Sequence, residues 1–161
     1  MRLLAQSRYF DLYSYEGVDI EDILRKLNTE RLRPEYVLAR EKSGFAGLLA
    51  EIVDTIYLEA SDILDIHSYN LKATIKFVST TEDVAAILRA YTHSSSTEAS
   101  FYLHDNRTIY IAVSDLTLGM LGHEMGHALI SHYFVVPPPM KVQEVLCGYI
   151  DFHLQKKVGR R

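Results

Sequence analysis

The segment from His123 to His127 reads His-Glu-Met-Gly-His, and these residue types could bind a metal ion and activate a water on it. On an α-helix, residues four apart lie about 40° from each other around the axis, so both imidazoles can reach one cation. Glu124 lies about 100° from His123, close enough to contact a water on that cation without being its ligand. A catalytic zinc has three protein ligands and an open position for water. The segment therefore predicts a site for one Zn²⁺ ion, with His123 and His127 as ligands and Glu124 as the general base.

The third ligand is expected after the end of this helix. The extended pattern HExxHxxGxxH fails, because Ile130 and Tyr133 stand where it needs glycine and histidine. His132 falls one residue short of the required position, and we expect it to be solvated or to cap the helix. The prolines at 137–139 cannot continue a helix, since each lacks an amide donor and has a fixed φ.

Residues 140–157 have the spacing of a second helix, with an apolar face at Val142, Val145, Leu146, Ile150 and Leu154. Glu144 lies in its first turns. If this helix returns antiparallel past the first, the carboxylate of Glu144 reaches the two imidazoles and completes a His2Glu site.

The neighbours of Glu144 support this prediction. An uncompensated carboxylate among Val142, Val145 and Leu146 would be costly, so Glu144 is expected to have a partner. Gly148 lies one turn further on nearly the same face, where it would let the two helices approach closely. Asp151 either hydrogen-bonds to a ligand histidine or is a surface carboxylate, and the second reading is favoured.

These residues together resemble a known family. HEMGH, followed after the prolines by P-x-K-V-Q-E-V-L-C-G-Y, resembles the gluzincin zinc metallopeptidases, above all their small single-domain members with the peptidase MA-like (minigluzincin-like) pattern. The resemblance implies one zinc ion, the ligands His123, His127 and Glu144, and Glu124 as the general base. It covers residues 73–155 well and the first 70 loosely.

The chain departs from the family pattern at three positions. Lys141 replaces a tryptophan and Val145 a glycine, and Gly148 stands where thermolysin-like enzymes have an aspartate that orients a ligand.

The resemblance also implies a substrate-binding strand. In the family, an edge strand along the cleft pairs with the extended substrate backbone. By position that strand consists of Ser100, Phe101, Tyr102, Leu103 and His104, although a plain structural hairpin is the alternative.

Size and composition favour one globular domain over residues 1–161, and the family resemblance implies that its core lies at 73–155. The formal net charge of −4 argues against a nucleic-acid partner. No apolar run is long enough for a membrane span, and the start lacks the features of a signal peptide, so a cytoplasmic location is expected. The single cysteine, Cys147, rules out an internal disulfide, and a small buried residue is its favoured reading.

The hydrophobic periodicity predicts an α+β fold with a small mixed sheet of about four strands, and the family resemblance implies that this fold is zincin-like. Strands are expected at residues 8–15 and 73–78 and in a hairpin over residues 99–113 that turns at Asp105-Asn106. Helices are expected at residues 19–27, from Pro34 to about Leu64, and from Glu82 to Thr92. The long helix and the HExxH helix, capped by Ser114 or Asp115, should pack on the sheet, and the helix that carries the third ligand follows.

The predicted function is hydrolysis of a peptide bond by a metal-activated water, with a peptide or protein as substrate. Two alternatives remain open: a non-catalytic zinc-binding module that holds a peptide or protein, and a regulatory peptidase with one specific target. A donor for the developing oxyanion is also required, and Tyr133, His132, His104 and His153 are equal candidates. Tyr149 falls where the family has its tyrosine but is expected to be packed.

Overall fold

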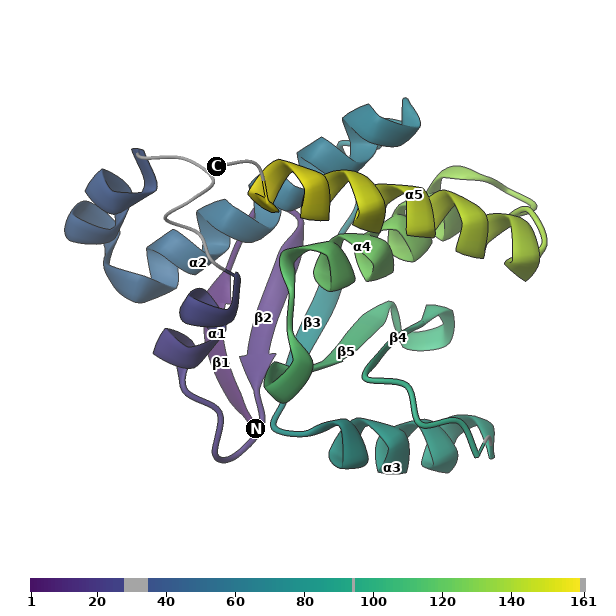
Figure 1. The fold of residues 1–161 in the computed structure, drawn as a ribbon, viewed down its shortest axis with the longest axis horizontal. Coiled ribbons are helices and arrows are strands. Elements are labelled where there is room, and N and C mark those ends of the chain that lie inside the picture. The colour runs from purple at the N-terminus through teal and green to yellow at the C-terminus, as the bar shows by residue number, and fades with distance from the viewer. Residues whose placement is uncertain (28–34, 94, 160–161) are drawn as a thin grey trace.

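A mixed five-stranded sheet forms the centre of the fold, which is α+β as expected (Figure 1). The computed structural model describes residues 1–27, 35–93 and 95–159. The strand order is β1-β2-β3-β5-β4, one strand more than the four expected. Strands β2, β3 and β5 are parallel, whereas β1 and β4 pair antiparallel at the two edges. The strands are β1 (Arg2–Gln6), β2 (Phe10–Ser14), β3 (Ala73–Val78), β4 (Ser100–Leu103) and β5 (Thr108–Ala112).

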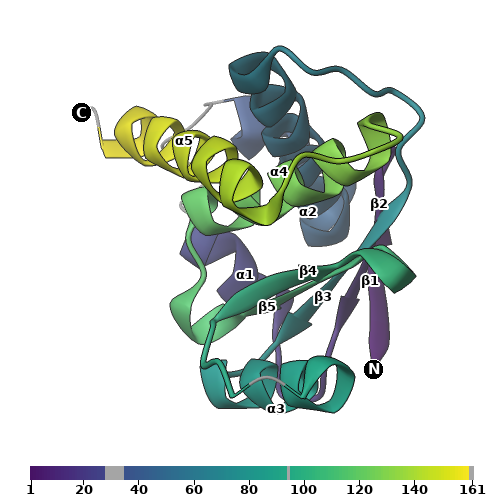
Figure 2. The same cartoon turned by 90° about the vertical axis from the view of Figure 1, so that its right-hand side faces the viewer.

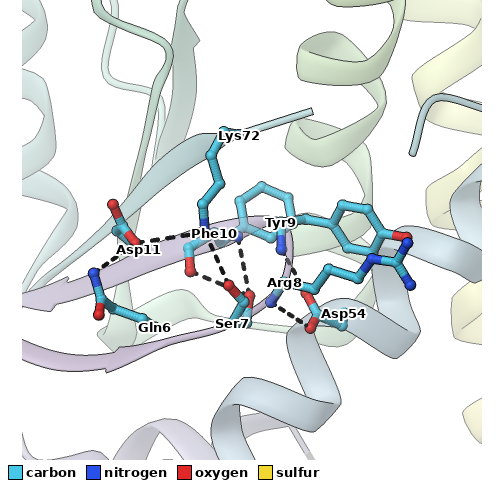
Figure 3. Close-up of polar contacts among 8 residues, drawn as sticks. All are labelled: Gln6, Ser7, Arg8, Tyr9, Phe10, Asp11, Asp54 and Lys72. Atoms are coloured by element: carbon cyan, nitrogen blue, oxygen red, sulfur yellow. Dashed lines mark hydrogen bonds and ion pairs between the residues drawn. The ribbon is translucent and has the colours of Figure 1, made fainter. Parts of the chain in front are cut away.

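The additional strand is β1, and the turn after it explains why the strand predicted at residues 8–15 begins too early. The amides of Arg8 and Tyr9 donate to the two carboxylate oxygens of Asp54, at 2.9 and 3.2 Å, instead of joining a strand ladder (Figure 3). Ser7 closes the turn, since its hydroxyl accepts from the amide of Phe10 and donates to the carbonyl of Phe10. The partner that fixes this turn is 45 residues away in the chain, so no local pattern could reveal it.

Helices cover both faces of the sheet (Figure 2). One face carries α3, and the other carries α1, α2 and α4, with α5 packed on the side of α4 that is remote from the sheet (Figure 2). No helix in the described ranges is both long and apolar enough to cross a membrane. The helices are α1 (Ile20–Leu27), α2 (Glu35–Leu64), α3 (Thr81–Thr92), α4 (Leu118–Tyr133) and α5 (Met140–Gly159).

The long helix α2 packs on the sheet as expected. Its residues Leu49, Ile52 and Tyr57 are fully buried in the same cluster as the strand residues Phe10 and Ile75. The helix is kinked at Gly44, which has a φ of 72°, a conformation that glycine adopts without steric cost. Pro34, where this helix was predicted to start, lies outside the described residues.

The contact between α4 and α5 differs from the expected one. Gly148 does not lie in it: a Cβ at Gly148 would meet no atom within 4 Å. The close approach is made by α4 instead, where a Cβ at Gly126 would lie 2.6 Å from Ile150 and 2.9 Å from the sulfur of Cys147. The buried face of α5 consists of Gln143, Cys147, Ile150 and Leu154, and the predicted face members Val142 and Val145 are exposed.

Candidate metal centre

Helix α4 carries the HExxH segment along a deeply buried face. Its N-cap is Thr117, whose side chain accepts from the amide of Met120 at 3.1 Å. The predicted caps Ser114 and Asp115 belong instead to a 3-10 turn that joins β5 to the helix. This turn and cap bring His123, Glu124 and His127 onto the side of α4 that faces β4 and α5.

The three predicted ligands meet in one cluster. The Nε2 atom of His123 lies 3.3 Å from Glu144 Oε2, and Nε2 of His127 lies 2.7 Å from Glu144 Oε1. One donor atom from each residue lies within 4.8 Å of the other two, about twice a zinc–ligand bond of about 2.0–2.2 Å. Two imidazole nitrogens and one carboxylate are also a donor set that suits a catalytic zinc site. The residues therefore fit a single metal ion after small side-chain rotations.

Glu144 reaches this cluster in different surroundings from those expected. Its side chain is 54% exposed, compared with 9% for His127, and its neighbours Val142 and Val145 point to solvent. Glu144 is therefore not surrounded by buried apolar side chains, and the predicted reason for its needing a partner does not hold. Glu144 meets the two imidazoles because it borders the face of α5 that packs on α4.

Gln143 fixes the orientation of His127, a role that the sequence analysis missed. The amide nitrogen of Gln143 donates to the carbonyl of Pro138 at 3.0 Å, so its Oε1 faces Nδ1 of His127, also at 3.0 Å. Because Oε1 only accepts, Nδ1 of His127 must carry the hydrogen. If a metal ion replaced the contact between Nε2 and Glu144, the neutral ring would offer the ion the lone pair of Nε2 and keep its hydrogen on Nδ1. The sequence signal for this role was the position of Gln143, which directly precedes Glu144 and follows the three prolines closely.

Glu124 lies beside the ligands and is nearly buried. Its side chain accepts a hydrogen bond from the hydroxyl of Ser100 at 2.7 Å. Burial raises the pKa of the Glu124 carboxyl above its usual value, an effect that the Ser100 hydrogen bond and the two histidines oppose. A carboxylate with a raised pKa holds a proton more firmly once it has accepted one, which suits a general base.

A cleft of about 330 Å³ opens between α4, α5 and β4, and Glu124 and the three potential ligands all line it. The strand β4 is an edge strand, with β5 on one side only (Figure 1). Of the segment predicted to bind substrate, Ser100, Phe101 and Tyr102 line the cleft from the strand. Leu103 ends the strand, and His104 lies in the following 3-10 turn and also lines the cleft.

The candidate oxyanion donors lie in different places. His104 is the candidate at the cleft, and its Nδ1 lies 3.5 Å from the hydroxyl of Tyr102. His132 is paired with Asn70, and Tyr133 packs against Phe134. Tyr149, expected to be packed, is 51% exposed and stacks edge-on against His153.

The structure also places Cys147 and Asp151, two other residues of the second helix that the sequence analysis considered. Cys147 is fully buried between α4 and α5, as expected. Burial, reinforced by the carboxylates of Glu124 and Glu144, raises the pKa of its thiol, so it stays protonated at neutral pH. Asp151 is half-buried opposite Gly119 and accepts a hydrogen bond from Gln155.

Comparison of this chain with models of protein families, with curated proteins and with solved structures finds no match. The assignment of a function therefore rests on the residues of the centre itself.

Proposed function

We propose that this chain is a zinc-dependent metallopeptidase with a zincin-like fold of the gluzincin type. The observation that carries the proposal is the convergence of His123, His127 and Glu144 in a cleft that also contains the buried Glu124. A general base within reach of a three-ligand metal site is the arrangement that hydrolysis by a metal-activated water requires.

The residues divide the chemistry among them. His123, His127 and Glu144 would hold one Zn²⁺ ion, which would supply an acidified water and a Lewis acid for the scissile carbonyl. Glu124 accepts a proton from the attacking water and passes it to the leaving amine. Gln143 favours the tautomer of His127 with the hydrogen on Nδ1, which leaves Nε2 for the ion.

The substrate that suits the cleft is an extended peptide. An edge strand has backbone donors and acceptors on its open side, and a peptide can add to it as a further strand. In this chain the edge strand β4 lines the cleft next to Glu124. A peptide paired with β4 would pass in front of the metal cluster.

The substitution Glu124→Gln tests this mechanism. The amide that it introduces cannot accept the proton, so we expect the variant to bind zinc with the stoichiometry of the wild type and to lose hydrolysis by at least about 100-fold, as general bases contribute about 10²–10⁴-fold. Cleavage of a mixed peptide library, with and without chelator, provides the measurement. A variant that cleaves at the full rate would remove Glu124 from the mechanism.

The same assay distinguishes the alternative functions. Chelator-sensitive retention of peptides without cleavage by the wild type would indicate a zinc-dependent binding module. Cleavage of a single cellular protein, with generic peptides left intact, would indicate a regulatory peptidase.

A further inference from the structure

The hydroxyl of Ser100 links the edge strand to the proposed general base. Ser100 is the first residue of β4 and lies opposite Ile111 of β5, which fixes its backbone in the sheet. Its Oγ lies 2.7 Å from Oε2 of Glu124, 24 residues later on α4. A separation this short is typical of a charge-assisted hydrogen bond from a hydroxyl to a carboxylate.

This hydrogen bond acts on a side chain that has little other freedom. Glu124 is 6% exposed, and its neighbour Met125 is fully buried in the core. A carboxylate can still rotate about its terminal torsion, which is broad and has no strong minima. A donor on one oxygen removes that rotation and leaves the other oxygen to receive a proton.

We propose that Ser100 is a positioning residue for Glu124: its hydroxyl holds one carboxylate oxygen so that the other faces the attacking water. The inference rests on the proposed peptidase function and extends it. It also gives Ser100 a role beyond that of a backbone partner for substrate. Preorganisation of this kind acts on the chemical step, because a misplaced base lowers the rate without weakening substrate binding.

Three variants test the proposal by activity. Ser100→Ala removes the donor, whereas Ser100→Thr keeps a hydroxyl on a side chain that suits a strand. Thr97→Ala is the control, since it removes an exposed hydroxyl just before β4. For Ser100→Ala we expect kcat to fall about 10–100-fold, the range for supporting residues around metal sites, with KM unchanged. Ser100→Thr should recover most of kcat, and Thr97→Ala should retain it. An unchanged kcat in Ser100→Ala, or a loss confined to KM, would overturn the proposal.

A second test does not depend on hydrolysis. Thermal unfolding of the metal-free wild type, Ser100→Ala, Glu124→Gln and the double variant forms a cycle. If the two side chains interact, the shifts in Tm are not additive, and a crystal structure of Ser100→Ala shows the Glu124 carboxylate in more than one orientation. Additive shifts together with an unmoved carboxylate would overturn the positioning role. These readouts decide the inference even if the wild type cleaves no peptide, an outcome that would contradict only the proposed function.

Discussion

At the scale of single residues, the orientation of His127 depends on a chain of two hydrogen bonds. The carbonyl of Pro138 accepts from Gln143, and Gln143 accepts from His127. A carbonyl cannot donate, so this chain has one direction only. A backbone group in the loop between α4 and α5 thereby determines which nitrogen of His127 is available to the proposed metal ion.

The substitution Gln143→Leu breaks this chain while keeping a side chain of similar size. We expect zinc affinity to fall about 10–100-fold, because a free imidazole populates both tautomers and more ring orientations. Competition with a chromophoric chelator measures the affinity. The matched control is Gln155→Leu on the same helix, whose amide contacts Asp151 outside the centre, and it should bind zinc like the wild type. Equal affinities for both variants would show that Gln143 has no part in the site.

At the scale of secondary-structure elements, the glycines of α4 determine how closely α5 can pack. Gly126 faces Cys147 and Ile150, and Gly148 on α5 faces open space. The same substitution should therefore have opposite effects at the two positions.

We expect Gly126→Ala to destabilise the protein by about 1–3 kcal/mol, because the new methyl group overpacks a contact in which the short Cys147 side chain cannot retreat. Gly148→Ala should stabilise it by about 0.5–1 kcal/mol, the gain in helix propensity. Urea unfolding of the metal-free variants measures both changes. Destabilisation by Gly148→Ala would contradict this packing.

Some of these elements could be predicted from the sequence and others could not. The HExxH helix, the hairpin that precedes it and the long helix were predictable, because each rests on local periodicity. The meeting of Glu144 with the two histidines was expected from a second helix returning after the prolines and from the family resemblance, whereas the argument from apolar neighbours of Glu144 failed. The strand β1 and the true start of β2 were not, because Asp54 sets that turn from a distant helix. The orientation of α5 was misjudged at Val142 and Val145, because its buried face contains the polar Gln143 and the small Cys147 in place of a continuous apolar stripe.

At the scale of the whole molecule, a bound metal ion would add a link between α4 and α5, which side-chain packing and the hydrogen bonds of His127 already hold together. An ion that binds the native chain alone raises stability by about 2.7 kcal/mol at 100 times its Kd. For a chain of this size that corresponds to a rise in Tm of about 5–10 °C.

We expect zinc to produce this rise in the wild type and to produce little of it in Glu144→Ala, which lacks the ligand from α5. Scanning calorimetry with matched metal analysis provides the measurement. Glu98→Ala, which removes another exposed carboxylate of the same cleft, is the control and should keep the full rise. Equal zinc content and equal shifts in the wild type and Glu144→Ala would make the third-ligand assignment wrong.

The loop at residues 134–139, with its three consecutive prolines, acts as a stiff tether between the two halves of the centre. A short, stiff tether keeps its attached groups at a high effective concentration relative to each other. In the proposed metal site, Glu144 would thus be held close to the two imidazoles, as one arm of a chelating ligand is held close to the others. The affinity for a metal ion would then depend on the backbone between the helices as much as on the three donor atoms.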